Sequence, residues 1–218
     1  MTVYYCLPEQ NGMTVGIQED QRIYKQENLA VSSLTKLVSR RDQKKLPQAA
    51  IMAGVLFEHF NMTDLIQSLG GDPHNTPLVI CNRYANWDYV RELMAADAVR
   101  TAQNVDSYVA TAWFPAAVQG YLTIRYGNVG QAITLATEES DVIAATVETF
   151  MPASGVTVLA SFESVPAVIG SSAVEGNRPR PFGAISLIPH DHSAEQILTL
   201  VKTHQAMYRQ SSGVSLAV

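Results

Sequence analysis

The clearest hydrophobic pattern in the chain lies in residues 46–60, where apolar side chains recur at steps of three and four. The positions of this stripe are Leu46, Ala50, Ala53, Phe57 and Phe60. Ile51 and Val55 add a second apolar face. A repeat near 3.6 residues is typical of an α-helix, and apolar residues on two faces indicate that the helix is covered on most sides. We therefore expect a buried helix over residues 46–60.

Short, largely apolar runs between turn residues predict the strands. These runs are residues 77–81, 133–136, 156–160 and 184–188. Continuous apolar runs of this length are typical of strands that are buried on both faces, as in parallel sheets. We expect residues 133–136 to form a central strand of the sheet.

Helical patterns alternate with these strands. They cover residues 63–69 (closed by Gly70-Gly71), residues 86–99 and residues 141–150. A last helix is predicted after Ser193, which forms a capping-box pattern with Gln196. The side of this helix that we expect to pack on the sheet carries Ile197, Leu200, Val201, His204 and Met207. We interpret His204 as a residue at the edge of the core.

The beginning of the chain has a different pattern. Residues 3–17 contain two short strand-like pieces, and Asn11-Gly12 between them is a typical hairpin turn. Residues 20–40 are polar and show no clear period. Together, the alternating strands and helices predict an α/β fold with a mostly parallel sheet covered by helices, in a single domain over residues 1–218.

The composition and net charge of the chain indicate which kinds of molecule it binds. The 218 residues are 47% hydrophobic, which is enough for a sizeable core. A formal net charge of -5 argues against nucleic acid, because phosphate binding depends on clustered Lys and Arg. The one basic run, residues 40–45 (RRDQKK), is expected to be a solvated turn at a helix start. Its functional alternative is the docking of an acidic carrier protein.

Other kinds of site and segment find little support in the sequence. No apolar stretch reaches the roughly 20 residues that cross a bilayer, and the first residues lack a signal-peptide pattern, so we expect a cytoplasmic protein. Cys6 and Cys81 are too far apart for a metal motif or a disulfide framework. His190 and His192, with one Asp between them, fall short of a ligand set and are interpreted as exposed turn residues. We expect no metal and no cofactor.

One succession of motifs indicates a candidate reactive site. Residues 120–127 read GYLTIRYG, and Gly130-Gln131 leads into the strand-like run ITLAT at residues 133–137, which Glu138 and Glu139 follow. This succession resembles the nucleophile region of the β-ketoacyl synthases of the thiolase superfamily. In that family Gly-His-Leu-(Ser/Thr)-Ile-x-Tyr-Gly leads through Gly-Pro into a strand that ends at the acyl-accepting cysteine.

The resemblance extends over about residues 38–190. Residues 156–163 (VTVLASFE) resemble the family's strand that ends in Gly-Gly-Ala-Glu, and residues 180–182 (RPF) resemble its Arg-Pro-Phe. Residues 40–45 resemble an early basic turn before a helix. The likeness therefore implies one thiolase-like half of a ketosynthase. The His-Gly-Thr motif and the Gly-His pair of the family's second half do not occur in the sequence.

The resemblance places Glu139 at the nucleophile position. A carboxylate does not form the thioester that a thiolate forms, so we expect no catalytic residue here and no enzyme activity of the chain alone. A decarboxylase or acyltransferase built around Glu139 is the least favoured alternative. We expect instead that Glu138 and Glu139 cap the following helix, where carboxylates are favourable by ~0.3 to 1 kcal/mol.

Ketosynthase-like chains without the cysteine include the chain-length factors of type II polyketide systems. The resemblance therefore implies a heterodimer with a catalytic β-ketoacyl synthase, with substrates carried on acyl carrier protein, in aryl polyene-like polyketide or fatty-acid-type biosynthesis. The residues that it places at the acyl tunnel or the interface are Thr111, Ala112, Trp113, Phe114, Pro115, Ile133 and Leu135.

Trp113 and Phe114 have two interpretations. As a tunnel floor they would stop a growing chain by their volume, and as ordinary interface residues they would only bury area. For the whole chain, the alternative to a ketosynthase partner is a self-associating module that binds acyl chains or acyl carrier protein.

Overall fold

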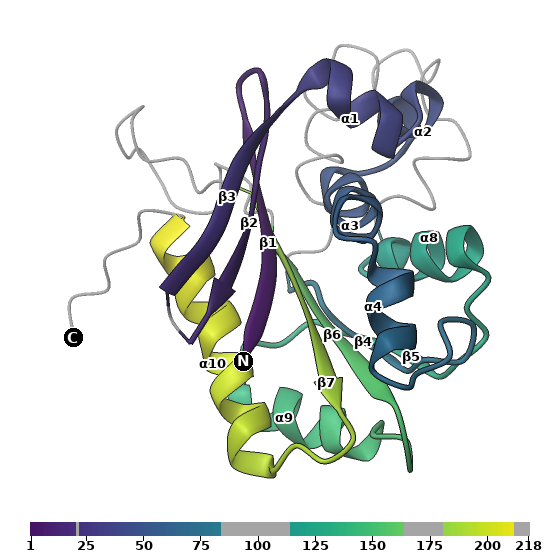
Figure 1. Ribbon diagram of the computed structural model, residues 1–218, viewed down its shortest axis with the longest axis vertical. Coiled ribbons are helices and arrows are strands. Elements are labelled where there is room, and N and C mark those ends of the chain that lie inside the picture. Colours follow the sequence, from purple (N-terminus) through teal and green to yellow (C-terminus); the bar gives the residue numbers. More distant parts are fainter. Residues whose placement is uncertain (21, 84–113, 164–180, 212–218) are drawn as a thin grey trace, which may run out of the picture.

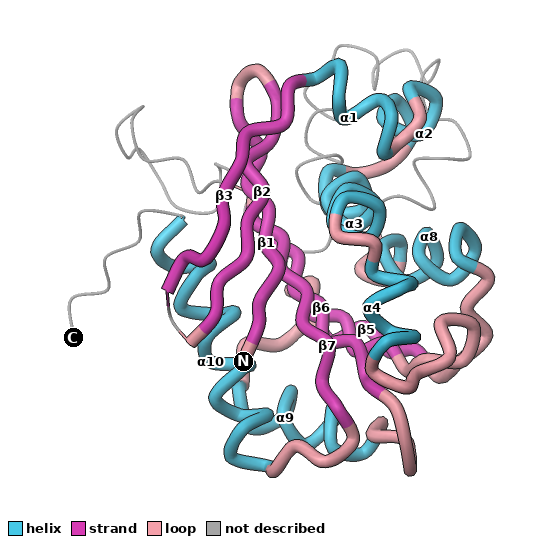
Figure 2. Tube along the Cα trace, in the orientation of Figure 1, coloured by secondary structure: helices cyan, strands magenta, loops and turns pink. Residues whose placement is uncertain are grey.

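Seven strands form one sheet, and helices lie on both of its faces in the computed structural model (Figures 1 and 2). The structure describes residues 1–20, 22–83, 114–163 and 181–211. The strands are β1 (Thr2–Glu9), β2 (Gly12–Glu19), β3 (Arg22–Ala30), β4 (Leu78–Cys81), β5 (Ala132–Leu135), β6 (Val156–Glu163) and β7 (Phe182–Pro189). The helices are α1 (Val31–Leu37), α2 (Arg40–Lys45), α3 (Gln48–His59), α4 (Met62–Ser68), α8 (Ala117–Tyr126), α9 (Ser140–Thr149) and α10 (Ala194–Ser211).

The strand order is β3-β2-β1-β7-β6-β4-β5. Only β4 pairs in parallel, with β5 on one side and β6 on the other, whereas all other neighbours in the described sheet are antiparallel. The expected mostly parallel sheet is therefore not found. The reason is that the first three strands form a meander, and strands joined by tight turns must run antiparallel.

The β1–β2 hairpin confirms the turn expected near Asn11, shifted by one residue. The turn consists of Gln10 and Asn11, and Gly12 is the first residue of β2, opposite Glu9. A Cβ atom at Gly12 would lie 2.0 Å from the carbonyl oxygen of Leu29 in β3, so a larger residue does not fit there. β3 itself was missed because its residues are mostly exposed on both faces, which leaves no alternation to detect.

The helix expected over residues 46–60 is α3, and it begins only after Pro47. Leu46 is extended, with φ -92° and ψ 146°, because the residue before a proline disfavours the helical region. Buried residues lie all around α3, as the two apolar faces predicted. The predicted strands at β4, β6 and β7 and the helices α4 and α9 are also confirmed, whereas residues 86–99 lie outside the described residues.

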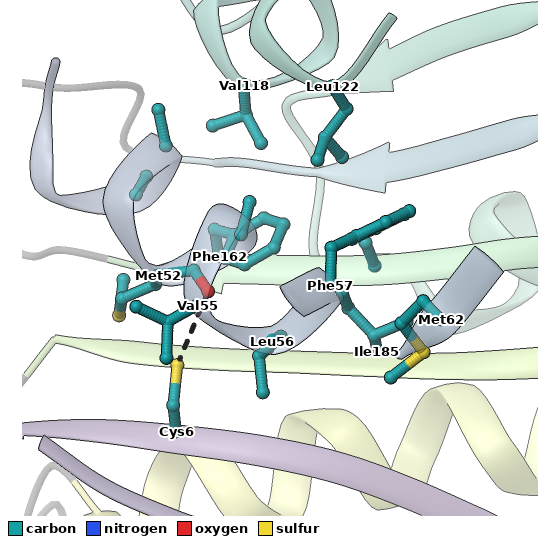
Figure 3. Close-up of a cluster of buried hydrophobic side chains, with 14 of the residues drawn as sticks. Cys6, Met52, Val55, Leu56, Phe57, Met62, Val118, Leu122, Phe162 and Ile185 are labelled. Carbon is teal, nitrogen blue, oxygen red and sulfur yellow. Dashed lines mark hydrogen bonds between the residues drawn. The ribbon is translucent and has the colours of Figure 1, made fainter. Parts of the chain in front are cut away.

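Two hydrophobic clusters cover the two faces of the sheet. One joins the sheet to α3 and α8, and Figure 3 shows Phe162 and Ile185 of the sheet beside Met52, Val55 and Leu56 of α3. The other joins the opposite face to α9 and α10. Within the described residues, no helix is long and apolar enough to cross a bilayer.

The terminal helix α10 starts at the predicted capping box. The amide of Ser193 donates to Gln196 Oε1 (2.8 Å), and the amide of Gln196 donates to Ser193 Oγ (3.3 Å). His204 lies in the core and not at its edge, since only 1% of its surface is exposed.

Two serine hydroxyls accommodate the His204 ring inside the core. Ser186 Oγ donates to the carbonyl of Thr2, so it accepts from Nε2 of His204 (2.9 Å), while Nδ1 accepts from Ser161 Oγ (2.9 Å). Burial lowers the pKa of His204 to about 3, so the ring is neutral at physiological pH.

Candidate functional site

The turn between β5 and α9 is the place where the resemblance puts a nucleophile. Glu139 is exposed and occupies the N-cap position of α9, but its side chain makes no capping hydrogen bond. Its amide donates to Thr137 Oγ1 at 3.1 Å. The carboxylate of Glu138 forms an ion pair with Arg83 instead of capping the helix. The expectation that both carboxylates cap α9 is therefore wrong, because Arg83 offers Glu138 a full positive charge.

The same turn is held by the terminal helix. The side-chain amide of Gln205 in α10 donates through Nε2 to the carbonyl of Glu138 (2.8 Å). Its Oε1 accepts from Ser140 Oγ, also at 2.8 Å. Sequence reasoning missed Arg83 and Gln205, because each contacts the turn from more than fifty residues away in the chain.

A buried polar group lies at the ends of β4 and β6, beside this turn. Glu163 ends β6 and is 8% exposed, and burial raises its pKa to about 7, although the nearby Arg83 opposes the shift. Asn82 is fully buried, and its Nδ2 donates to the carbonyl of Pro115 (3.2 Å). Burial also raises the pKa of Cys81 to about 12, so this thiol is not a thiolate at neutral pH. In the sequence, the signal for this buried group was a charged residue, Glu163, at the end of an apolar run.

Of the predicted interface residues, Thr111, Ala112 and Trp113 lie outside the described residues. Ile133 and Leu135 in β5 are half-buried and pack against the cluster under α9. β5 lies at the end of the strand order, so the expectation of a central strand is wrong. An apolar run indicates burial of the strand faces but does not tell whether one or both edges are paired.

Phe114 and Pro115 lie just before α8 and differ in their exposure to solvent. Pro115 is half-buried, and Phe114 is 54% exposed and lines a groove of about 760 Å³ between α2 and α8. The groove is lined by Arg41, Asp42, Lys45, Leu46, Pro47, Phe114, Ala116, Ala117, Gly120, Tyr121, Ile124 and Arg125. Ile124 is 85% exposed, so an apolar floor faces solvent beside the basic side chains of α2.

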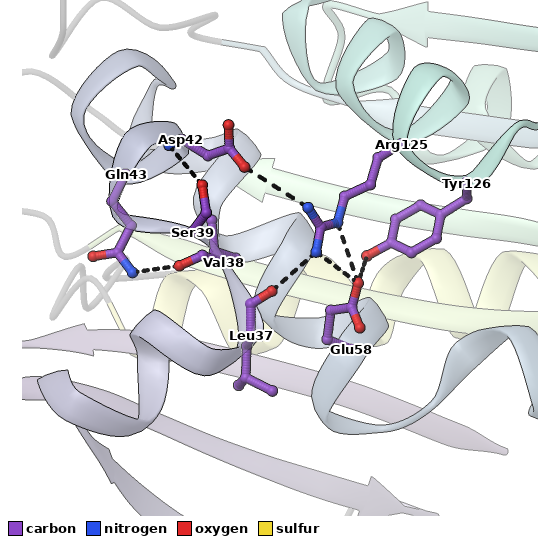
Figure 4. A network of polar contacts seen from close by, with 8 residues as sticks. All are labelled: Leu37, Val38, Ser39, Asp42, Gln43, Glu58, Arg125 and Tyr126. Carbon is purple, nitrogen blue, oxygen red and sulfur yellow. Dashed lines mark hydrogen bonds and ion pairs between the residues drawn. The ribbon is translucent and has the colours of Figure 1, made fainter.

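The basic run forms the short helix α2, so the expected turn is wrong, although none of its residues is buried and α3 follows it. Ser39 caps this helix, since its Oγ accepts from the amide of Asp42 at 3.1 Å. Arg125 of α8, which also lines the groove, links the neighbouring helices. It donates to Glu58 Oε1 through Nε (3.2 Å) and Nη2 (2.9 Å), and it lies 3.7 Å from Asp42 (Figure 4). These contacts fix α2 and α3 relative to α8.

Solved structures share this architecture. One match is to a chain of a complex described as a type II polyketide synthase acyl carrier protein with its hexaketide-bound ketosynthase (AntDE:AntF). There the TM-score is 0.53 and the identity 20%, over 73% of this chain and 52% of the other. Another is to a chain of the ketosynthase ApeO in complex with its chain length factor ApeC from Xenorhabdus doucetiae. That match has a TM-score of 0.52 and 11% identity, over 79% of this chain and 66% of the other.

No protein-family model and no curated protein sequence matches the chain. The chain spans between about half and two thirds of the length of the two matched structures. At these identities the likeness concerns the fold. The chain therefore has a ketosynthase-like fold, of the kind found in complexes of ketosynthases with chain length factors and carrier proteins.

Proposed function

We propose that this protein is a non-catalytic, chain-length-factor-like subunit that pairs with a catalytic β-ketoacyl synthase and shapes its acyl tunnel. The observation that carries the proposal is the ketosynthase-like fold. The sequence resemblance adds to it by putting a carboxylate, Glu139, at the nucleophile position. The ion pair of Glu138 with Arg83 further supports a structural use of this turn. The buried Cys81 thiol does not offer a substitute nucleophile.

The outer edge of β5 supports pairing with a partner strand, because no further strand of the described sheet pairs with it. The carbonyls of Gln131 and Leu135 accept hydrogen bonds from the amides of Leu78 and Asn82, so these groups point toward β4. Since neighbouring residues of a strand alternate, the backbone groups of Ala132 and Thr134 point toward the outer edge. Gln119 of α8 reaches this edge, since its Nε2 donates to the carbonyl of Ala132 (3.3 Å). A strand edge with no further described strand beside it is a template for another strand, and a permanent partner removes the risk of aggregation.

Thr134→Pro is expected to weaken association with the ketosynthase. The substitution removes the outward N–H of Thr134 and leaves the hydrogen bonds between β5 and β4 in place. The measurement is the mass in solution of the chain alone and of the chain together with the ketosynthase encoded nearest to it. The wild type should form a one-to-one complex, and Thr134→Pro should weaken it by at least about tenfold, the equivalent of one or two backbone hydrogen bonds.

Thr134→Val is the matched control, because it keeps the N–H and removes only the hydroxyl that donates to Gln119 Oε1 (2.9 Å). It should bind the ketosynthase like the wild type. Equal binding by Thr134→Pro would contradict pairing through β5. A wild-type chain that ignores every ketosynthase would contradict the proposed function itself.

Trp113→Ala is expected to lengthen the products of the complex. In the proposed role, the indole occupies the floor of the partner's acyl tunnel, and alanine leaves room for additional chain extension. The products are compared by mass spectrometry between complexes of wild type and variant. Weaker association with an unchanged product length would instead assign Trp113 to the ordinary core of the interface.

A second candidate function rests on the groove between α2 and α8. Its apolar floor with Arg41 and Lys45 beside it suits an acidic protein such as an acyl carrier protein, and favours the self-associating, carrier-binding module. The same mass measurement separates the two functions. A homodimer that binds acyl carrier protein and ignores the ketosynthase would support the module.

A further inference from the structure

In the turn from β5 to α9, one residue, Glu138, is bound both by Gln205 and by Arg83. Gln205 of α10 binds the carbonyl of Glu138 and accepts from Ser140, which brackets the turn with two 2.8 Å hydrogen bonds. Arg83, two residues after the end of β4, binds the carboxylate of Glu138. We refer to Gln205 and Arg83 together as the turn clamp.

The surroundings of the clamp hold its two members in place. The guanidinium of Arg83 lies 5.9 Å from the ring centre of Tyr208, which is one turn beyond Gln205 in α10. The backbone amide of Arg83 also donates to the buried carboxylate of Glu163. α10 packs closely along α9, as Figure 1 shows, so the helix that carries Gln205 is itself fixed. The clamp is therefore anchored in the core on both sides.

The clamp acts on a short strand, which Gln119 of α8 also holds through hydrogen bonds with Ala132 and Thr134. β5 has four residues, and its described partner is β4 on one side. A short strand at an edge frays easily because few backbone hydrogen bonds hold it. Its last bond runs from the amide of Asn82 to the carbonyl of Leu135, three residues before Glu138. Fixing Glu138 therefore limits fraying at this end of the strand.

We infer that Gln205 and Arg83 are positioning residues for the partner-binding edge: they fix the turn after β5 and thereby the strand that pairs with the ketosynthase. The inference rests on the proposed function for the identity of the partner. It adds that association depends on α10, through side chains that act on β5 indirectly. In this role the turn holds no nucleophile and instead supports association with the ketosynthase.

Gln205→Leu tests the clamp, because leucine has a similar volume and removes both hydrogen bonds. The first readout is amide exchange, followed by NMR in the chain alone. The amide of Asn82 bonds to the end of β5 beside the clamp, whereas the amide of Leu78 bonds to Gln131 at the far end. Exchange at Asn82 should accelerate about tenfold, the effect of one or two lost hydrogen bonds, while Leu78 serves as the internal reference.

The second readout is the dissociation constant of the complex with the ketosynthase, which should rise about tenfold in Gln205→Leu. Arg83→Met should act in the same direction. Gln210→Leu is the matched control, since it makes the same change at an exposed position of α10 and should alter neither readout.

The outcomes separate the inference from the proposed function. Unchanged exchange at Asn82 in Gln205→Leu overturns the clamp. Faster exchange with unchanged ketosynthase binding overturns its role in assembly and leaves the proposed function intact. A wild-type chain that binds no ketosynthase overturns the proposed function and, with it, the partner that the inference names.

Discussion

Phe162→Ala is expected to lower the free energy of unfolding by about 3–5 kcal/mol, the usual cost of deleting a fully buried phenyl ring. Phe162 lies in β6 with no exposed surface, inside the cluster that joins the sheet to α3. The neighbouring strand makes room for its ring with a glycine: a Cβ atom at Gly183 would lie 3.1 Å from Phe162 Cδ1. Alanine would leave a cavity that β6 and β7 are too well paired to close.

Urea unfolding followed by circular dichroism measures this loss. Domains of this kind are stable by about 5–15 kcal/mol, so the variant should lose a large fraction of its stability. Phe114→Ala is the control, because its ring is 54% exposed and its removal should change stability by less than about 0.5 kcal/mol. A large loss in the control would mean that the groove beside α8 is covered in solution, for example by a second copy of the chain.

The sequence predicts well those elements whose pattern reflects burial alone. α3 follows from its two apolar faces, and β4 and β6 follow from short apolar runs. Strand direction is a different matter, because β7 is as apolar as β6 yet runs antiparallel to it. Direction is set by the path of the connections, which leaves no mark on hydrophobicity. β3 had no detectable pattern because its residues face solvent.

The candidate site shows the same division. Glu139 was located from a run of motifs that are local in sequence, and the structure places it at the start of α9 as expected. Arg83 and Gln205 could not be assigned, because nothing near them in the sequence indicates that they meet at Glu138. Such contacts depend on which strands and helices become neighbours. Only the fold provides that information.

The stability of the protein is expected to fall as the pH rises from about 4.5 to about 7, because of Glu163. Burial raises the pKa of this carboxyl from 4.5 to about 7 in the folded state. In that window the folded chain holds a proton that the unfolded chain has released. The free energy of unfolding should therefore decrease by about 3 kcal/mol across the window and stay level above it, at about 1.4 kcal/mol for each pKa unit.

Glu163→Gln should remove this dependence, since the amide has the shape of the protonated acid and cannot ionise. The variant should be more stable than the wild type at pH 8 and similar to it at pH 4.5, as measured by urea unfolding at both pH values. Glu139→Gln, the same change at an exposed carboxylate, should keep the wild-type slope because Glu163 is intact. If the free energy of unfolding still fell with pH in Glu163→Gln, the pH dependence would come from other groups. Loss of the slope would assign it to Glu163, whose carboxyl shares the cation Arg83 with Glu138 of the turn.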